Sequence, residues 1–257
     1  VQLTLECNKQ ETKHMIENVP MIEILVPSNV KQVGLVGTGA IGSAWAAHFL
    51  ARGLDVTATD PSPKAEQKLR TAVDNAWPSL EQLGLAKGAS PNRLSFTTSI
   101  DEALKDADFI QESTPEQEGI KDKVMSAISK AAHPNVVIAS STSGIVPTRL
   151  QAQCKNPERM IVGHPFNPVY LIPLVEVVGG KQTAQETIDW AMEFYKHWGK
   201  TPLHCRVETP GHLANRLQDA ILSEAMQLIA DGVATTDELD TALTAGPGLR
   251  WALIGSL

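Results

Sequence analysis

Cysteine is scarce in this chain of 257 residues, which contains only three. Cys7, Cys154 and Cys205 are odd in number and far apart, and they form neither a CxxC pair nor, with histidine, a cluster of metal-ligand spacing. This excludes a disulfide-stapled fold and a typical zinc site. We therefore expect free thiols and no bound metal.

Basic residues are also fewer than acidic ones. The chain has 22 Lys and Arg and 29 Asp and Glu, which give a net charge of -7. Nucleic acids and anionic membranes attract basic surfaces, so neither is an expected partner. No stretch approaches the roughly 18 apolar residues of a membrane helix. The first 30 residues also lack the basic start and apolar core of a signal peptide. These absences favour a cytoplasmic protein.

What the chain does have is an alternation of short apolar runs and helical stretches, which is typical of βα units on a parallel sheet. Ile41, Trp45 and Phe49 recur every four residues and Gly53 follows. This spacing predicts a first helix with one apolar face and a glycine C-cap. The predicted strands are Gln32–Gly37, Asp55–Asp60, Asp108–Glu112, Asn135–Ser140, Met160–His164, Leu174–Val178 and Pro202–Arg206, with a helix over Ala184–His197 between the last two.

These elements divide the chain into three parts. Residues 1–30 show no clear period and are treated as an N-terminal extension, and residues 31–206 are predicted to form an α/β Rossmann-type domain with a doubly wound, mostly parallel sheet. Residues 207–257 are predicted to begin a smaller all-helical domain. Since about fifty residues are few for a self-sufficient core, we expect it to continue past the end of this chain. Its first helix is predicted from the spacing of Leu213, Leu217, Ile221 and Leu228.

A glycine motif, GxGxxG, follows the first predicted strand and opens the first helix. In that position the glycines permit a tight turn and a close approach to a pyrophosphate at the helix N-terminus. Asp60 ends the second strand, where a carboxylate would bind the ribose hydroxyls and repel a 2′-phosphate. The pattern predicts NAD rather than NADP; the alternative is a plain turn with Asp60 as a cap. The predicted cofactor residues of this region are Gly37, Gly39, Ala40, Ile41, Gly42 and Asp60.

Polar side chains also end later strands, where open α/β sheets bind ligands. Oxidising an alcohol requires a group that removes the hydroxyl proton, and His164 is the candidate base. Glu176 is the only acidic residue in the apolar run 169–178, and a carboxylate there costs stability unless it is paired. The twelve-residue spacing suits two neighbouring strands joined by a turn. The alternative is a hydrogen-bonded histidine of the core.

With these motifs in place, the run from Val33 to Gly255 resembles the 3-hydroxyacyl-CoA dehydrogenase superfamily. The family's S-[NS]-T-S, GxHxxNP, LVEV and NRL signatures fall on Ser143, His164, Glu176 and Asn215. The resemblance implies that His164 is the base, Glu176 its orienting carboxylate, and Ser143 and Asn215 donors to the alcohol or keto oxygen. It also implies that Glu116 and Lys121 contact the nicotinamide half of NAD. A homodimer built by helices of the second domain is implied as well.

Within this superfamily the sequence resembles the carnitine 3-dehydrogenase branch and, next to it, the gulonate 3-dehydrogenases related to lambda-crystallin. The expected reaction is NAD-dependent oxidation of the 3-hydroxyl of a small 3-hydroxy acid, with L-carnitine the first choice. L-Gulonate and a 3-hydroxyacyl-CoA remain alternatives, as does an NAD-binding structural protein without activity. The plain NRL sequence at Asn215 favours the gulonate branch.

Charged and aromatic residues give this substrate expectation a physical basis. Arg250 can clamp a carboxylate, and Trp251 or Tyr170 can face a quaternary ammonium. The alternative for Arg250 and Trp251 is packing at a helix start or a subunit interface. The predicted substrate residues are Phe166, Asn167, Tyr170, Arg250 and Trp251.

Overall fold

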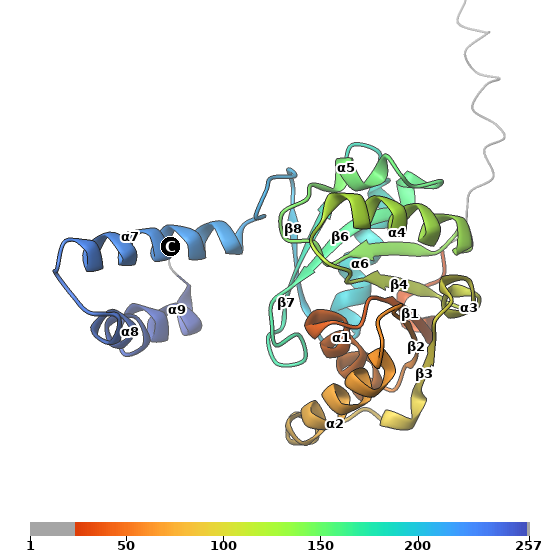
Figure 1. Ribbon diagram of the computed structural model, residues 1–257, viewed down its shortest axis with the longest axis horizontal. Coiled ribbons are helices and arrows are strands. Elements are labelled where there is room, and N and C mark those ends of the chain that lie inside the picture. The colour runs from red at the N-terminus through yellow and green to blue at the C-terminus, as the bar shows by residue number, and fades with distance from the viewer. Residues whose placement is uncertain (1–23, 256–257) are drawn as a thin grey trace, which may run out of the picture.

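A computed structural model describes residues 24–255 of the chain. It consists of a twisted sheet with helices on both faces and an arm of three helices that extends from it (Figure 1). Residues 1–23 of the predicted extension lie outside the described residues. Residues 24–30 lie against the helix α6 (Gln185–His197) and the turn that follows it, where Trp190 donates to the carbonyl of Leu25 and Trp198 Nε1 lies 3.2 Å from the carbonyl oxygen of Pro27.

Eight strands form one sheet in the order β3-β2-β1-β4-β5-β6-β7-β8. Neighbouring strands are parallel except β6 and β7, which are antiparallel. This confirms the predicted Rossmann-type, mostly parallel sheet. The strands are β1 (Gln32–Val36), β2 (Asp55–Thr59), β3 (Leu94–Thr97), β4 (Phe109–Glu112), β5 (Val137–Ser140), β6 (Met160–Pro165), β7 (Leu174–Gly179) and β8 (Thr201–Cys205).

Strand β3 is the one that the sequence pattern missed. It is an edge strand of four residues, and only Leu94 in it is buried. An edge strand with one buried side chain has no apolar run to reveal it. The other seven strands were predicted to within two residues at each end.

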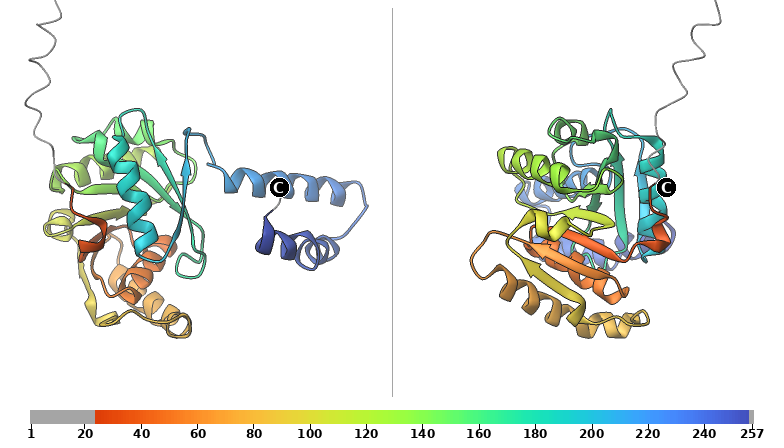
Figure 2. Two further views of the ribbon diagram at one scale, coloured as in Figure 1. Left: turned by 180° about the vertical axis from the view of Figure 1, so that it is seen from behind. Right: turned by 90° about the vertical axis from the view of Figure 1, so that its right-hand side faces the viewer.

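Helices cover both faces of the sheet, and each face has its own apolar core. Trp45, Phe49 and Phe194 belong to one core, and Leu104 and Met125 to the other. Two views of the molecule show the two helical layers (Figure 2). The remaining helices of this part are α1 (Ala40–Ala51), α2 (Ala65–Leu83), α3 (Ile100–Leu104), α4 (Glu118–Ala131) and α5 (Pro147–Gln151).

Helix α1 differs from its prediction in one respect. We expected one apolar face, but every residue from Gly42 to Ala51 is buried. The reason is that α2 packs on α1 and that Phe194 and Tyr195 of α6 contact its aromatic rings. A helix buried on all sides shows no polar face in its sequence. Gly53, with φ +83°, follows its end as predicted.

The helical arm consists of α7 (Ala214–Ala230), α8 (Thr236–Thr244) and α9 (Pro247–Ile254). The long helix predicted after Pro210 is present as α7, but no residue of the three helices is buried. Leu217 and Leu253 are 66% and 80% exposed. No helix among residues 24–255 has the length and apolar character needed to cross a membrane.

Candidate active site

The turn between β1 and α1 has the backbone geometry that its glycines require. Gly37 has φ +92°, and a Cβ there would come within 2.7 Å of the Ser113 backbone. At Gly42 a Cβ would lie 1.9 Å from the carbonyl oxygen of Gly37, so neither position accepts a side chain. Gly39 faces open space instead. The middle glycine therefore leaves room for a ligand at the N-terminus of α1.

This turn borders a cavity of about 630 Å³ at the carboxyl ends of β1, β2 and β4. Asp60 lies at its rim, where one carboxylate oxygen accepts from the backbone N–H of Thr38 at 2.8 Å and the other from that of Ser62 at 2.8 Å. Partial burial by itself raises the pKa of Asp60, but these hydrogen bonds outweigh it and hold the pKa below the usual range. Asp60 is therefore an anion with lone pairs left for ribose hydroxyls. The cavity, the open Gly39 and Asp60 together fit NAD.

His164 and Glu176 lie directly opposite each other on the antiparallel strands β6 and β7. Their side chains meet, with His164 Nδ1 2.8 Å from Glu176 Oε2, and both are buried. Since a carboxylate only accepts, Nδ1 donates, and the neutral ring keeps Nε2 as its acceptor. Ser143 Oγ lies 3.2 Å from that Nε2. The geometry leaves an unprotonated nitrogen beside a hydroxyl, which is the arrangement of a general base.

Glu176 also holds the junction with the helical arm. Its second oxygen, Oε1, accepts from the backbone N–H groups of Leu213 at 2.9 Å and Ala214 at 2.8 Å, at the start of α7. Burial alone raises the pKa of Glu176, but the bonds from His164, Ala214 and Leu213 outweigh burial and lower it. Glu176 is therefore ionised and fully engaged on both oxygens.

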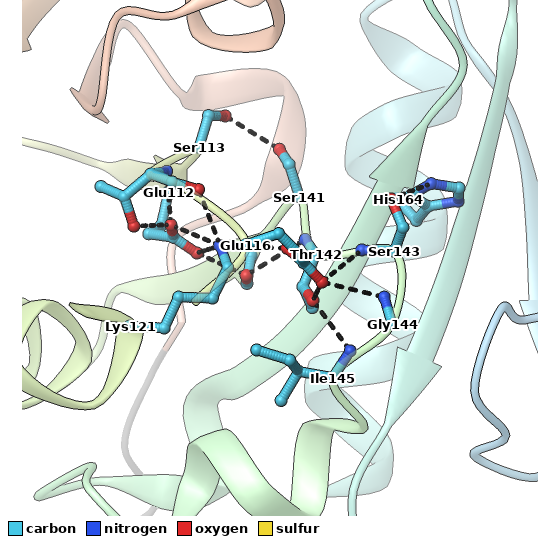
Figure 3. A network of polar contacts seen from close by, with 12 residues as sticks. Glu112, Ser113, Glu116, Lys121, Ser141, Thr142, Ser143, Gly144, Ile145 and His164 are labelled. Atoms are coloured by element: carbon cyan, nitrogen blue, oxygen red, sulfur yellow. Dashed lines mark hydrogen bonds and ion pairs between the residues drawn. The ribbon is translucent and has the colours of Figure 1, made fainter. Parts of the chain in front are cut away.

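Glu116 fixes the loop that carries Ser143 (Figure 3). Its Oε1 accepts from the backbone N–H of Gly144 at 2.9 Å, from that of Ser143 at 3.2 Å and from the Thr142 hydroxyl. Burial raises the pKa of Glu116, yet the bonds from Thr142 and Gly144 and the nearby Lys121 lower it overall. A carboxylate at this position therefore orders the loop beside His164.

Lys121 lies behind Glu116 rather than in the cavity. It is completely buried, with Nζ 2.8 Å from Glu112 Oε1 and 3.7 Å from Glu116 Oε2. A buried carboxylate such as Glu112 needs a cation, and Lys121 supplies it. Its direct contact with NAD stays a prediction, and in this geometry Glu116 lies between it and the loop.

The expected substrate residues fall into two groups. The ring of Phe166 lies 5.2 Å from that of His164, and Asn167 and Tyr170 line a neighbouring cavity of about 500 Å³. Arg250 and Trp251 lie on α9, which packs on α8 and not on the sheet (Figure 1). The structure does not bring these two to His164, because α7 runs away from the sheet.

Asn215 and His212 belong to the junction between the sheet domain and the helical arm. Asn215 is half-buried in the first turn of α7, and it makes no hydrogen bond to His164 or Ser143 among the described residues. The sequence pattern missed His212, which is buried with φ +49°, its ring 5.0 Å from that of His164 and its Nε2 3.1 Å from the carbonyl oxygen of Thr142. Burial lowers the pKa of His212. The only signal in the sequence was its place directly after Pro210-Gly211.

Comparison with known proteins identifies the family of this chain. The 3-hydroxyacyl-CoA dehydrogenase NAD binding domain matches residues 32–209, and the C-terminal domain of the same family matches residues 211–257. The chain belongs to the 3-hydroxyacyl-CoA dehydrogenase family. It is therefore an NAD-dependent oxidoreductase that acts on a CH–OH group.

Relatives of this chain include proteins named L-carnitine dehydrogenase. It is 53% identical to an L-carnitine dehydrogenase of Bacillus cereus over 228 residues, which are 89% of this chain and 70% of that protein. The L-carnitine dehydrogenase of Pseudomonas aeruginosa is 53% identical over 229 residues, 89% of this chain and 71% of the relative.

Solved structures of the family have the same fold. An NAD-dependent 5-formyl-3-hydroxy-2-methylpyridine 4-carboxylic acid 5-dehydrogenase superimposes with a TM-score of 0.83 at 33% identity, covering 88% of this chain and 74% of that one. The (S)-3-hydroxybutyryl-CoA dehydrogenase of Ralstonia eutropha superimposes with a TM-score of 0.76 at 32% identity, covering 84% of this chain and 77% of that one.

Proposed function

We propose that this dehydrogenase oxidises the 3-hydroxyl of L-carnitine to the 3-keto acid, with His164 and Glu176 as its base. The observation that supports it most is the contact between His164 Nδ1 and Glu176 at 2.8 Å, which makes Nε2, 3.2 Å from Ser143 Oγ, the nitrogen that accepts the substrate proton. The relatives named L-carnitine dehydrogenase support the choice of substrate.

In this mechanism His164 Nε2 takes the hydroxyl proton while the hydrogen on C3 leaves as hydride. NAD, when bound, accepts that hydride. Glu176 keeps Nδ1 protonated and stabilises the imidazolium that forms. Ser143 donates to the oxygen as it becomes a carbonyl, and Asn215 is proposed as a second donor. The proton and the hydride account for both hydrogens that the alcohol loses.

The cofactor and substrate ends of the site are assigned to different residues. Asp60 favours NAD, because a 2′-phosphate would face its carboxylate. Phe166 and Tyr170 are proposed to face the trimethylammonium group by cation–π attraction. Arg250 and Trp251 remain candidates for the carboxylate and cation ends only if α9 of another chain, or a movement of the arm, brings them to His164.

We further propose that the enzyme acts as a homodimer in the cytoplasm. The exposed apolar side chains of α7–α9, Leu217 and Leu253 among them, support an interface there, and the free thiols Cys154 and Cys205 suit a reducing compartment. Light scattering on the purified protein tests the dimer: we expect twice the chain mass, and a monomer at working concentration would contradict it.

A substrate panel tests the proposed reaction. The protein is incubated with NAD or NADP and with L-carnitine, L-gulonate or 3-hydroxybutyryl-CoA, and the absorbance of the reduced cofactor is recorded. We expect L-carnitine with NAD to give the highest kcat/KM. Faster turnover of 3-hydroxybutyryl-CoA or L-gulonate would reassign the substrate, and no turnover of any substrate would support a structural role instead.

A further inference from the structure

A row of hydrogen bonds runs from the buried core to the wall of the cofactor cavity. The Tyr195 hydroxyl lies 2.7 Å from Gln111 Oε1, and Gln111 Nε2 lies 2.9 Å from Ser141 Oγ. Ser141 Oγ is in turn 2.9 Å from Ser113 Oγ, a contact that the close view of the site shows (Figure 3). Tyr195 and Gln111 are fully buried, whereas Ser113 lines the cavity.

The orientation of the Gln111 amide is fixed by its neighbours. Its Nε2 lies 3.4 Å from the carbonyl oxygen of Gly163, which can only accept, so the amide nitrogen faces Gly163 and Ser141. Its oxygen then accepts from the Tyr195 hydroxyl. Burial raises the pKa of Tyr195 well above its ordinary value, so the phenol keeps its proton. Gln111 therefore donates to Ser141.

Ser141 receives a second donor, and this decides where its own hydrogen points. Trp45 Nε1, which can only donate, lies 3.3 Å from Ser141 Oγ. A hydroxyl oxygen has two lone pairs, and Trp45 and Gln111 occupy both. Ser141 must then donate its single hydrogen to Ser113 Oγ.

Because Ser113 Oγ accepts from Ser141, the hydroxyl hydrogen of Ser113 is available to another acceptor. Its hydroxyl oxygen has no other hydrogen-bond partner within residues 24–255, and the side chain borders the cavity that also includes Gly37, Gly39 and Asp60. We propose that Ser113 is a pre-oriented hydrogen-bond donor to a phosphate or ribose oxygen of the dinucleotide, and that Gln111 is the positioning residue that sets its direction. The proposal depends on NAD binding in this cavity and not on which alcohol is oxidised.

The first test is the affinity of Ser113→Ala for NADH, measured by fluorescence titration without substrate. Loss of one hydrogen bond is expected to raise Kd at least about threefold, and more than about tenfold if the acceptor is a charged phosphate, with an unchanged melting temperature. Titration with ADP and ADP-ribose narrows the acceptor: a loss with both assigns a phosphate oxygen or the adenosine ribose, and a loss with ADP-ribose alone assigns the second ribose. Ser79→Ala, in α2 and outside this row of bonds, is the control and should bind like the wild type. A Kd for Ser113→Ala within twofold of wild type for all three ligands would overturn the proposal.

The second test addresses Gln111 through a double-mutant cycle. In Gln111→Glu the carboxylate accepts from Ser141, so Ser113 donates to Ser141 and turns its lone pairs toward the cavity. We expect Gln111→Glu to weaken NADH binding as much as Ser113→Ala does, with no further loss when both changes are combined. An additive loss would mean that the new charge acts through space, and would overturn the role of Gln111. If Gln111→Glu does not fold, Ser141→Ala replaces it, since this change also removes the donor that orients Ser113.

Discussion

The sheet domain and the helical arm use apolar side chains in opposite ways. In the sheet domain two layers of helices bury Phe49 and Met125 completely, one on each face of the sheet. In the arm, α7 has leucines and isoleucines at helical spacing, yet none of its residues is buried. The comparison teaches that an apolar stripe predicts a helix and the existence of a partner surface, but not which surface covers the stripe.

The two regions also differ in chemistry. The sheet domain supplies the phosphate turn, Asp60, His164 and Ser143, whereas the arm reaches the site only through its first residues, where Leu213 and Ala214 bind Glu176. The well-packed sheet domain therefore positions both the proposed base and the residues expected to bind the cofactor. A change at the start of α7 would therefore reach His164 through Glu176.

The largest effect is expected from His164→Gln, which removes the base of the sheet domain. Turnover should fall about a thousandfold, because general-base catalysis is lost. NADH affinity should stay within about twofold, because His164 is not among the residues that line the cavity that Asp60 borders. Steady-state kinetics and NADH fluorescence measure the two quantities. Near-normal turnover would show that another group is the base.

A core substitution and an arm substitution compare the two regions directly. Phe109 is fully buried and its ring contacts those of Phe49, Phe194, Trp190 and Tyr195, whereas Leu253 is 80% exposed. Phe109→Ala should lower the free energy of unfolding by about 3–5 kcal/mol, and Leu253→Ala should change it by less than about 0.5 kcal/mol. Urea denaturation gives both values. A large loss for Leu253→Ala would mean that the arm is packed in solution.

Glu176→Gln tests the connection between the regions. An amide has one acceptor oxygen, whereas Glu176 accepts from His164 on one oxygen and from Leu213 and Ala214 on the other. We expect kcat to fall about a hundredfold while NADH affinity is kept. The melting temperature should fall too, because the single amide oxygen can accept on only one of the two sides and leaves the other without an acceptor. An unchanged melting temperature would argue that the junction does not depend on Glu176.

A further comparison is a pH dependence within the sheet domain. Lys200 is buried beside Trp45, and its Nζ donates to the carbonyls of Val169 and Ile172. Burial, with the nearby Arg52, lowers its pKa to about 7. At pH values between about 7 and the ordinary pKa of lysine, Lys200 binds a proton in the unfolded chain but not in the folded one. The free energy of unfolding should therefore rise as pH increases from about 7 toward 10.

Lys200→Met is the control for this titration. The variant should lack the part of the rise that Lys200 causes, when unfolding is measured by urea denaturation at several pH values. Equal slopes for the two proteins would show that Lys200 does not titrate in this range.

Local patterns predicted much of the sheet domain. The glycines, Asp60 and the facing pair His164 and Glu176 each follow from strand ends and from the spacing of residues along the chain. Strand β3 was missed because one buried leucine makes no pattern. The complete burial of α1 was missed because only the tertiary structure brings α2 and α6 against it.

The polar network and the arm depend on contacts between distant segments. His212 binds the carbonyl of Thr142, 70 positions earlier, and Tyr195 binds Gln111, 84 positions earlier. No period in the sequence reveals such pairs. Arg250 was assigned to the substrate from its residue type, but its position depends on the direction of α7, which the packing at the junction determines.

The central claim is that this enzyme transfers hydride from C3 of L-carnitine to NAD. The most direct measurement uses L-carnitine with deuterium at C3 and analyses the reduced cofactor by mass spectrometry. We predict that the label appears in NADH and that none reaches the water, because the hydrogen on C3 leaves as hydride while only the hydroxyl proton passes to His164. Unlabelled NADH, or label released to water, would contradict the account.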